Sequence, residues 1–465
     1  MTTHKGRSAD LRRTLGLTDL VLLGINGVVG AGIFLGPDDI ARAAGPWAWA
    51  AYLGCGVMCL LIALCFAEMG GMYGETGGAY LYARDAFGPF AGFLVGWIVW
   101  LAAVLGWASV MTAFAAVAAT QTWLSAEVSG WLAAPLGQGM LIAALGVGLG
   151  GLNLLGARPG ATVNNIFSLA KLVPLGLFVI LGVFYASHSP FVDTSPQAAL
   201  GLREIALAMS WVLFLYSGFE EIPVPAGEAR DPQRDVPRAL AIVLGTACAV
   251  YVAVHLVAQA GFPGLHLVSD TPLSAAAGAF LPPIGVHLIA VGGFISLLGV
   301  NAAIAFTGPR SMFALARDGH LPRQFAWVHP RWQTPWPAIM ATSLLAMLLP
   351  ALEGISLNAR ETWPGIAWLI PRFALSDLLI MSALASLMQY IPTCLAVLVM
   401  RRRRPDAPRN FRVPGGDLVP VLALVLCLAL FVLAAPSERV GILVGISAGV
   451  VVYFINGLRA APRRK

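Results

Sequence analysis

Runs of about 20 apolar residues recur along this chain from Leu17 to Ile455, and each is long enough to cross the hydrocarbon core of a bilayer. The 465 residues are 58% hydrophobic and only 11% charged, whereas a soluble domain typically carries about 25% charged residues. A chain of this composition cannot cover its apolar surface with polar groups in water. The sequence therefore predicts an all-α membrane protein, because helices satisfy their own backbone hydrogen bonds in lipid.

The apolar runs divide into twelve predicted spans, which place both termini on the same side of the membrane. Their boundaries fall near 17–43, 47–69, 86–119, 137–155, 161–186, 204–225, 237–261, 283–314, 335–352, 373–400, 417–435 and 440–457. The segment 352–372 is too polar and too rich in breaks to be a clean span. We predict that it is an external loop with a short interfacial helix, because Trp363 and Trp368 suit the membrane interface.

The distribution of basic residues supports this alternation of spans. Of the 29 Lys and Arg residues, 23 fall on the side of the N-terminus, and five fall on the opposite side: Arg42, Arg203, Arg360, Arg372 and Arg439. Basic residues concentrate in the cytoplasmic loops of membrane proteins. We therefore expect a multi-pass protein of the cell membrane with both termini cytoplasmic. The net charge of +6 therefore reflects basic loops beside a lipid bilayer, and we expect no nucleic-acid partner.

The first span contains a cluster of glycines between Gly24 and Gly36 that is a poor basis for a continuous helix. Each glycine costs up to about 1 kcal/mol in a helix relative to alanine. A break within a span is tolerated where the freed backbone groups line a polar cavity. A half-helix that begins near Ile33 would direct free N–H groups into that cavity, which suits a carboxylate. Close helix packing by small residues is the alternative explanation.

The sixth span contains a second candidate break, where apolar residues meet Ser217 and Gly218 and then the carboxylates Glu220 and Glu221. Carboxylates at membrane depth are rare and usually functional. Glu220 would lie at the start of a second half-helix, where the helix dipole favours a negative charge. Alternatively, both carboxylates cap this half-helix or pair with an internal arginine, and the role of Glu221 stays open.

Lys171 is the only basic residue deep within a predicted span. Burial disfavours the charged form of an amine, which makes this side chain a candidate proton carrier. It could equally be a fixed positive charge that ties an unwound carbonyl to the helix bundle. The two candidate breaks lie five spans apart, so spans 1–5 and 6–10 could form inverted repeats around a site near the middle of the membrane.

Several motifs, in order along nearly the whole chain, resemble those of the amino acid–polyamine–organocation superfamily of transporters. They are GAGIF at 30–34, FAEM at 66–69 with GGAY at 77–80, GFE at 218–220, GEARDPQRDVPRA at 227–239, ARDGHLP at 316–322, and RRP at 403–405 with FRVP at 411–414. Each motif is modest by itself, and their shared order is specific.

The resemblance implies a leucine-transporter-type fold with 5+5 inverted repeats, broken helices 1 and 6, and two extra helices. The expected parts are a cytoplasmic N-terminus (1–16), inverted repeat 1 (17–186), inverted repeat 2 (204–400), a basic cytoplasmic loop (401–416), the peripheral spans 11 and 12 (417–457) and a cytoplasmic C-terminus (458–465).

The resemblance also implies an amino acid substrate whose carboxylate binds N–H groups of span one and whose ammonium group binds carbonyls at both breaks. The implied substrate-binding residues are Ile25, Asn26, Gly30, Ala31, Gly32, Ile33, Phe214, Leu215, Ser217 and Gly218. Phe214 matches an aromatic gate above the substrate. Ala31 departs from the Ser or Thr that is common at its position, so one side-chain donor is missing.

Two further residues are implied to couple transport to protons. Lys171 matches a lysine of proton-coupled and some exchanging members, and in sodium-coupled relatives an ion takes its place. Glu220 matches a carboxylate proposed to respond to protons in some exchangers. Ser296 and Asn301 are polar candidates for the surroundings of Lys171.

We therefore expect a secondary active transporter of amino acids, with proton-coupled symport by alternating access as the leading hypothesis. Obligatory exchange and transport of cationic amino acids or polyamines are the alternatives. An intramembrane enzyme would need a nucleophile and base or metal ligands at bilayer depth, and neither His255 nor His287 has a ligand partner three or four residues on. The six cysteines lie in apolar runs, so we expect no metal and no cofactor. A channel or nutrient sensor is a third, less favoured class.

Overall fold

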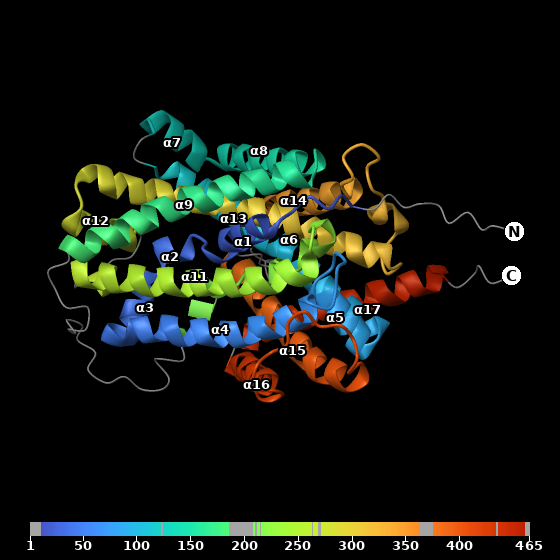
Figure 1. The fold of residues 1–465 in the computed structure, drawn as a ribbon. Helices are drawn as coiled ribbons and strands as arrows, with labels where there is room; N and C mark the ends of the chain where they lie inside the picture. Colours follow the sequence, from blue (N-terminus) through green and yellow to red (C-terminus); the bar gives the residue numbers. More distant parts are fainter. Residues whose placement is uncertain are drawn as a thin grey trace, which may run out of the picture.

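The computed structural model describes residues 11–121, 124–185, 208–209, 212–213, 215–262, 264–267, 271–362, 375–433 and 436–460, and these residues form helices joined by short connections (Figure 1). The first part of the chain forms α1 (Leu17–Val28), α2 (Gly32–Leu35), α3 (Pro37–Ala44), α4 (Ala48–Gly70), α5 (Ala79–Phe87), α6 (Pro89–Ala119), α7 (Ala126–Ala133), α8 (Pro135–Leu154) and α9 (Ala157–Tyr185). The second part forms η2 (Phe219–Glu221), η3 (Val224–Glu228), α11 (Pro232–Gly261), η4 (Leu265–Leu267), α12 (Pro272–Phe280), α13 (Pro283–Arg317), η5 (Arg323–Ala326), α14 (Trp336–Thr362), α15 (Leu375–Arg403), α16 (Leu418–Leu433) and α17 (Pro436–Ala460).

The helices α6 and α13 lie inside the bundle and pack against one another. Both are apolar around most of their circumference, as expected of helices buried on all sides. Helix α1 packs against α9, α11 and α13, so the glycine cluster that begins in its last turns lies among three long helices. This enclosure places the interrupted first span inside the protein rather than against lipid.

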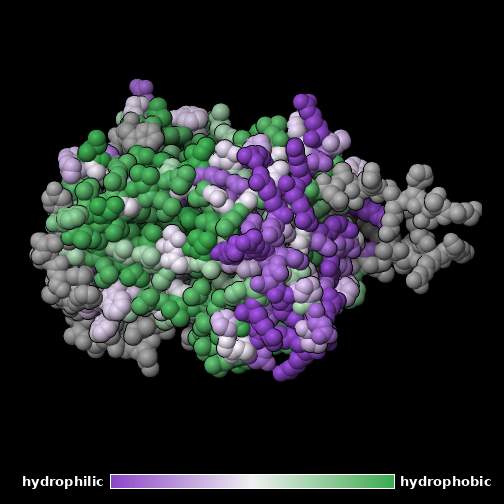
Figure 2. Space-filling model, viewed as in Figure 1, coloured by the Kyte–Doolittle hydropathy of each residue, from purple (hydrophilic) through white to green (hydrophobic). Residues whose placement is uncertain are grey.

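The outer helices expose apolar side chains to their surroundings. Leu136, Met140 and Val147 of α8 are exposed, and so are many leucines and valines of α16 and α17. Figure 2 shows hydrophobic residues over most of the face in view, with hydrophilic residues gathered toward the end where both termini lie. The surface thus has the division between an apolar band and a polar end that a bilayer requires.

Seven helical segments of the described chain are long and apolar enough to cross a membrane, and three shorter apolar helices accompany them: Trp336–Leu352, Leu418–Val432 and Gly441–Asn456. The prediction of twelve spans and of a 5+5 repeat therefore stays a prediction. Helix α14 continues to Thr362, about ten residues beyond the boundary that its hydropathy suggests. Trp363 and Trp368 lie outside the described residues.

Three backbone hydrogen bonds join the segment that precedes span one to the segment that follows span six. The amide groups of Thr14 and Leu15 donate to the Glu228 carbonyl over 2.8 and 3.0 Å, and the Arg230 amide donates to the Leu15 carbonyl over 2.9 Å. The carboxylate of Glu228 also forms an ion pair with Arg310 of α13, and both side chains are completely buried. The two interrupted spans are thereby joined to each other and to α13 at the end where the termini lie.

Candidate functional site

The first span is interrupted where the glycine cluster predicts a break. Helix α1 ends at Val28, and α2 begins at Gly32. Between them the Val29 amide still bonds the Ile25 carbonyl, whereas the amides of Gly30 and Ala31 form no helical hydrogen bond to the residue four positions before them. In this gap the Gly30 amide donates a hydrogen bond to the Val28 carbonyl over 2.7 Å. Among the hydrogen bonds of the described residues, none uses the amide groups of Ala31, Gly32 or Ile33 as donors. These three amides are the donors that the sequence assigns to a substrate carboxylate.

The break in span six lies directly against the break in span one. Gly218 has a φ of +115°, a left-handed conformation that favours glycine, and the turn η2 follows it. A Cβ atom on Gly218 would lie 2.8 Å from the carbonyl carbon of Gly27. The two backbones can approach this closely because both positions are glycines. Leu215, Ser217 and Gly218 are thus brought beside span one, while the predicted gate Phe214 lies outside the described residues.

Tyr251 of α11 connects the two breaks, and the motifs of the sequence did not identify it. Its hydroxyl lies 2.7 Å from the Val28 carbonyl and 2.9 Å from the Leu215 carbonyl. Both are carbonyls that an uninterrupted helix would bond internally. A tyrosine within an apolar run was the only signal in the sequence, and that signal does not reveal which carbonyls it meets.

Lys171 of α9 binds the unwound backbone of span one. Its fully buried ammonium group donates to the carbonyls of Asn26 and Val29 over 3.0 and 2.9 Å. Within the described chain, no carboxylate forms an ion pair with it. The carbonyl of Asn26, which the sequence assigns to the substrate's ammonium group, therefore accepts a hydrogen bond from Lys171 in this structure. The Ile25 carbonyl accepts from the Val29 amide.

The face of α9 that carries Lys171 contacts α1 and the backbone after it through polar side chains spaced three residues apart. Asn165 donates to the Asp19 carboxylate over 2.8 Å, and Ser168 donates to the Leu22 carbonyl one turn further on. Residues three apart lie on the same face of a helix, so Asn165, Ser168 and Lys171 form one polar stripe. This stripe fixes α9 along α1 and directs Lys171 to the break.

Helix α13 completes the surroundings of Lys171. Ser296 donates to the same Val29 carbonyl over 3.1 Å, as its polarity suggested. The Asn26 side chain donates to the carbonyl of Gly299 and to Asn164, in each case over 2.7 Å. Asn301 instead donates to the carbonyls of Leu297 and Val110, so it does not join this cluster.

Glu220 and Glu221 differ in their bonding although they are adjacent. The buried carboxylate of Glu220 accepts hydrogen bonds from the Gly218 amide and the Tyr390 hydroxyl, both over 2.8 Å. One oxygen of Glu221, Oε2, has no hydrogen-bond partner within the described part of the chain, and Thr307 of α13 lies beside this side chain. Glu220 thus closes the turn after Gly218, as a cap would, while Glu221 keeps acceptor capacity.

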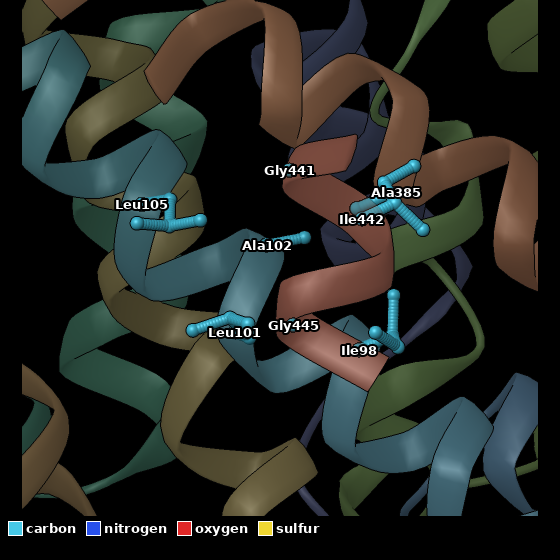
Figure 3. Close-up of a pocket in the computed structure, with 8 residues that line it drawn as sticks. All are labelled: Ile98, Leu101, Ala102, Leu105, Ala385, Gly441, Ile442 and Gly445. Atoms are coloured by element: carbon cyan, nitrogen blue, oxygen red, sulfur yellow. The ribbon is translucent and has the colours of Figure 1, made fainter. Parts of the chain in front are cut away.

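A separate crevice lies between α6, α15 and α17 (Figure 3). It is lined only by apolar residues: Ile98, Leu101, Ala102, Leu105, Ala385, Gly441, Ile442 and Gly445. None of the predicted site residues borders it. With no polar group to orient a solute, this crevice does not compete with the two breaks as a site for an amino acid.

The fold and the paired breaks define a multi-pass membrane protein with the features of a carrier. The family model described as amino acid permease matches residues 15–454, and the chain belongs to this family. It is 28% identical to the methylthioribose transporter of Bacillus subtilis (strain 168) over 460 residues, which cover 97% of this chain and 95% of that protein. It is 26% identical to the branched-chain amino acid permease BcaP of the same organism, over 96% of this chain and 93% of that protein.

A third relative, the serine/threonine exchanger SteT of Bacillus subtilis (strain 168), is 27% identical over 96% of this chain and 97% of its own length. The family and these relatives are transporters and not enzymes. Since each match spans nearly the whole of both chains, the expectation of an amino acid permease is confirmed.

Proposed function

We propose that this protein is a proton-coupled amino acid symporter that works by alternating access around the two breaks. The observation that carries the proposal is the position of Lys171, whose amine donates to two carbonyls of the unwound first span without a carboxylate partner among the described residues. A charge buried without a counter-ion is costly, so loss of its proton is chemically accessible. A neutral amine still has two N–H donors, enough for both carbonyls.

The substrate would be an α-amino acid whose carboxylate binds the free amides of Ala31, Gly32 and Ile33. Its ammonium group would bind carbonyls of the interrupted sixth span, near Leu215 and Ser217. Protonation of Lys171 from one side and release to the other would alter how firmly α9 holds α1. Since α1 also contacts α11 and α13, that change would bias which side of the site is open.

Obligatory exchange is the second candidate, and the similarity to a serine/threonine exchanger favours it. In an exchanger Lys171 would keep its proton and serve only to hold the break. The unpartnered oxygen of Glu221 supports a further variant, in which cationic amino acids or polyamines are carried. A competition screen of all common amino acids and polyamines in proteoliposomes, with and without a pH gradient, separates these three functions.

The carboxylate assignment is tested by Gly32→Leu. A Cβ atom at Gly32 would lie 3.0 Å from Cγ of Leu215, so a leucine side chain would crowd the free amides and prevent substrate binding. Gly245→Leu is the matched control, because a Cβ atom there meets nothing within 4 Å. Unchanged substrate affinity in Gly32→Leu would remove the carboxylate from this position.

Replacing sodium by choline tests the nature of the coupling ion. Lys171 already supplies the positive charge at the unwound carbonyls, so uptake should not change when sodium is withdrawn. Uptake that requires sodium would contradict a proton-coupled mechanism through this lysine.

A further inference from the structure

A group of buried polar side chains lies between α3, α4 and α11, toward the end of the molecule opposite the two termini (Figure 1). Asp38, Tyr52 and His255 are at most 2% exposed, and Gln259 is half-buried one turn along from His255. Oδ1 of Asp38, the Tyr52 hydroxyl and a ring nitrogen of His255 have no hydrogen-bond partner among the described residues, and Gln259 lies beside the His255 ring. We call these four residues the outer polar pocket.

The members of this pocket come from three helices and contact one another. The rings of Tyr52 and His255 lie 5.1 Å apart, and Asp38 belongs to α3, which packs against both α4 and α11. Gln259 donates to the carbonyl of Gly45, which directly follows α3. The pocket therefore joins α3 to the bundle helices α4 and α11.

One side of the pocket reaches the surface through Asp38. The Oδ2 atom of Asp38 pairs with the half-exposed Arg42 over 3.3 Å, and Arg42 also pairs with Asp39 over 2.7 Å. The Oδ1 atom is the one that remains unpartnered inside. Asp38 is thus a carboxylate with one oxygen bound near the surface and one directed to the protein interior.

The other side of the pocket reaches the two breaks through Tyr251. The rings of Tyr52 and Tyr251 lie 6.1 Å apart, and Tyr251 carries the hydroxyl that contacts the Val28 and Leu215 carbonyls. A change of charge in the pocket therefore acts next to the residue that joins the breaks.

Buried polar atoms without partners are uncommon, and a group of them in one place calls for a ligand or an exchangeable proton. An imidazole and a carboxylate buried in the same group as a phenol have the chemistry to bind one proton in this environment. We propose that the outer polar pocket is a proton-binding site, separate from Lys171, through which the pH on that side of the membrane regulates transport. This inference rests on the proposed transport function.

The expected effect follows from the charge that the proton creates. In this proposal a proton on His255 gives the pocket a positive charge, which favours the packing of α11 against the ionised Asp38 of α3. Because α3 continues the second half of the interrupted first span, this attraction opposes the opening of the site toward that side. Acid therefore slows exchange.

Other titratable groups near α11 are either engaged or lie further from His255. Besides the pocket's own Asp38 and Tyr52, the titratable groups near this region are Cys55 and Cys59 of α4, Cys248 and Tyr251 of α11, and Tyr216, which donates to the Tyr52 carbonyl over 3.1 Å. Helix α12 has no titratable side chain between Pro272 and Phe280. Lys171 of α9 is bound at the break, Glu220 of η2 is bound to Tyr390, and Glu228 of η3 is paired with Arg310. Asp19 of α1 is bound to Asn165. Arg42 and Asp39 lie at the surface end, next to the carbonyl of His266.

The first test is the pH dependence of amino acid exchange in proteoliposomes with equal pH on both sides, so that no gradient drives transport. The wild-type rate should fall as the pH decreases into the acid range, and His255→Gln should lose this decline. His287→Gln, another histidine of a long helix outside the pocket, is the matched control and should keep the wild-type profile. A wild-type profile in His255→Gln overturns the inference.

The second test does not depend on transport. Nitrogen NMR of purified protein with labelled histidine should contain one imidazole signal that titrates and is missing in His255→Gln, and its midpoint should move to lower pH in Asp38→Asn. A His255 signal that does not titrate, or a midpoint that Asp38→Asn leaves unchanged, also overturns the inference. An inactive wild type with a titrating His255 signal would instead contradict the proposed function alone.

Discussion

Lys171 and Arg310 are both basic residues with completely buried side chains, yet their partners differ in charge. Lys171 binds the neutral carbonyls of Asn26 and Val29. Arg310 forms an ion pair with Glu228, donates to the Phe306 carbonyl, and stacks 3.6 Å above the Phe306 ring. One cation is therefore held by dipoles alone, and the other by a full negative charge.

Under the proposed proton-coupled mechanism, this difference separates a coupling residue from a structural one. A guanidinium remains protonated under all ordinary conditions, and pairing with Glu228 cancels its charge, so Arg310 is a permanent link between α13 and the segment after span six. An amine can lose its proton, and Lys171 would then still donate to both carbonyls. Only the lysine can change its charge without losing its contacts, which is what a proton-coupled carrier needs at its moving span.

The largest effect is expected from breaking the buried ion pair. Arg310→Ala leaves the Glu228 carboxylate buried without a counter-ion, which should reduce the free energy of unfolding by about 3–5 kcal/mol. Thermal unfolding of the purified protein in detergent measures the loss.

The matched control for this variant is the double substitution Arg310→Met with Glu228→Leu, which removes both charges. It should recover most of the melting temperature, because an apolar pair of similar volume can replace a buried ion pair. If Arg310→Ala melts at the wild-type temperature, the pair is not the permanent link described above.

A smaller effect is expected from Tyr251→Phe, which removes the hydroxyl between the two breaks. Leaving a buried carbonyl unpaired costs about 1–3 kcal/mol, so the exchange rate should fall about tenfold while Lys171 remains in place. The rate of substrate counterflow at equal pH measures this change. Wild-type counterflow would mean that the two breaks do not depend on this bridge.

Ser296→Ala should have a still smaller effect, because Lys171 continues to donate to the Val29 carbonyl that Ser296 shares. The loss of one neutral hydrogen bond costs about 0.5–1.5 kcal/mol. Accumulation driven by a pH gradient should therefore persist at a reduced rate. Complete loss of coupling in Ser296→Ala would assign to the serine what we assign to the lysine.

The smallest effect is expected at the partly exposed ion cluster around Asp318, which contrasts with the buried pair. Burial raises the pKa of Asp318, but hydrogen bonds from Tyr80 over 2.6 Å, from Arg317 and from Arg84 outweigh it and hold the pKa below its ordinary value of 3.8. Since the pKa is lower in the folded than in the unfolded state, the carboxylate stabilises the fold above that ordinary value. This contribution is lost as the pH falls through the folded-state value.

Asp318→Asn should therefore lower the melting temperature slightly at neutral pH, and its difference from the wild type should shrink in acid. Melting curves of both proteins across the acid range measure this. A difference that grows in acid would reverse the sign that we assign to Asp318.

The sequence predicted the break in span one and the location of Lys171 because both rest on local patterns. Glycines that disfavour a helix and a lone lysine in an apolar run are visible without a partner. The contacts of Tyr251 with Val28 and Leu215, and the pairing of Arg310 with Glu228, join residues 36 to 223 positions apart. No local pattern encodes such pairs, because they follow from how the helices pack.

Glu220 and Asn26 show the same limit. The sequence identified both as site residues, but it could not foresee that Tyr390 would bind Glu220 or that Lys171 would occupy the Asn26 carbonyl. The sequence also missed the end of α14 at Thr362, because the apolar run ends about ten residues before the helix ends.

The proton-coupling role of Lys171 is tested most directly by uptake in proteoliposomes with an inward proton gradient, using the amino acid that the competition screen identifies. The wild type should accumulate this substrate above its external concentration and should alkalinise the external medium. Lys171→Ala should bind the substrate but only equilibrate it, without proton movement. Accumulation by Lys171→Ala at the wild-type level would contradict the assignment of coupling to this lysine.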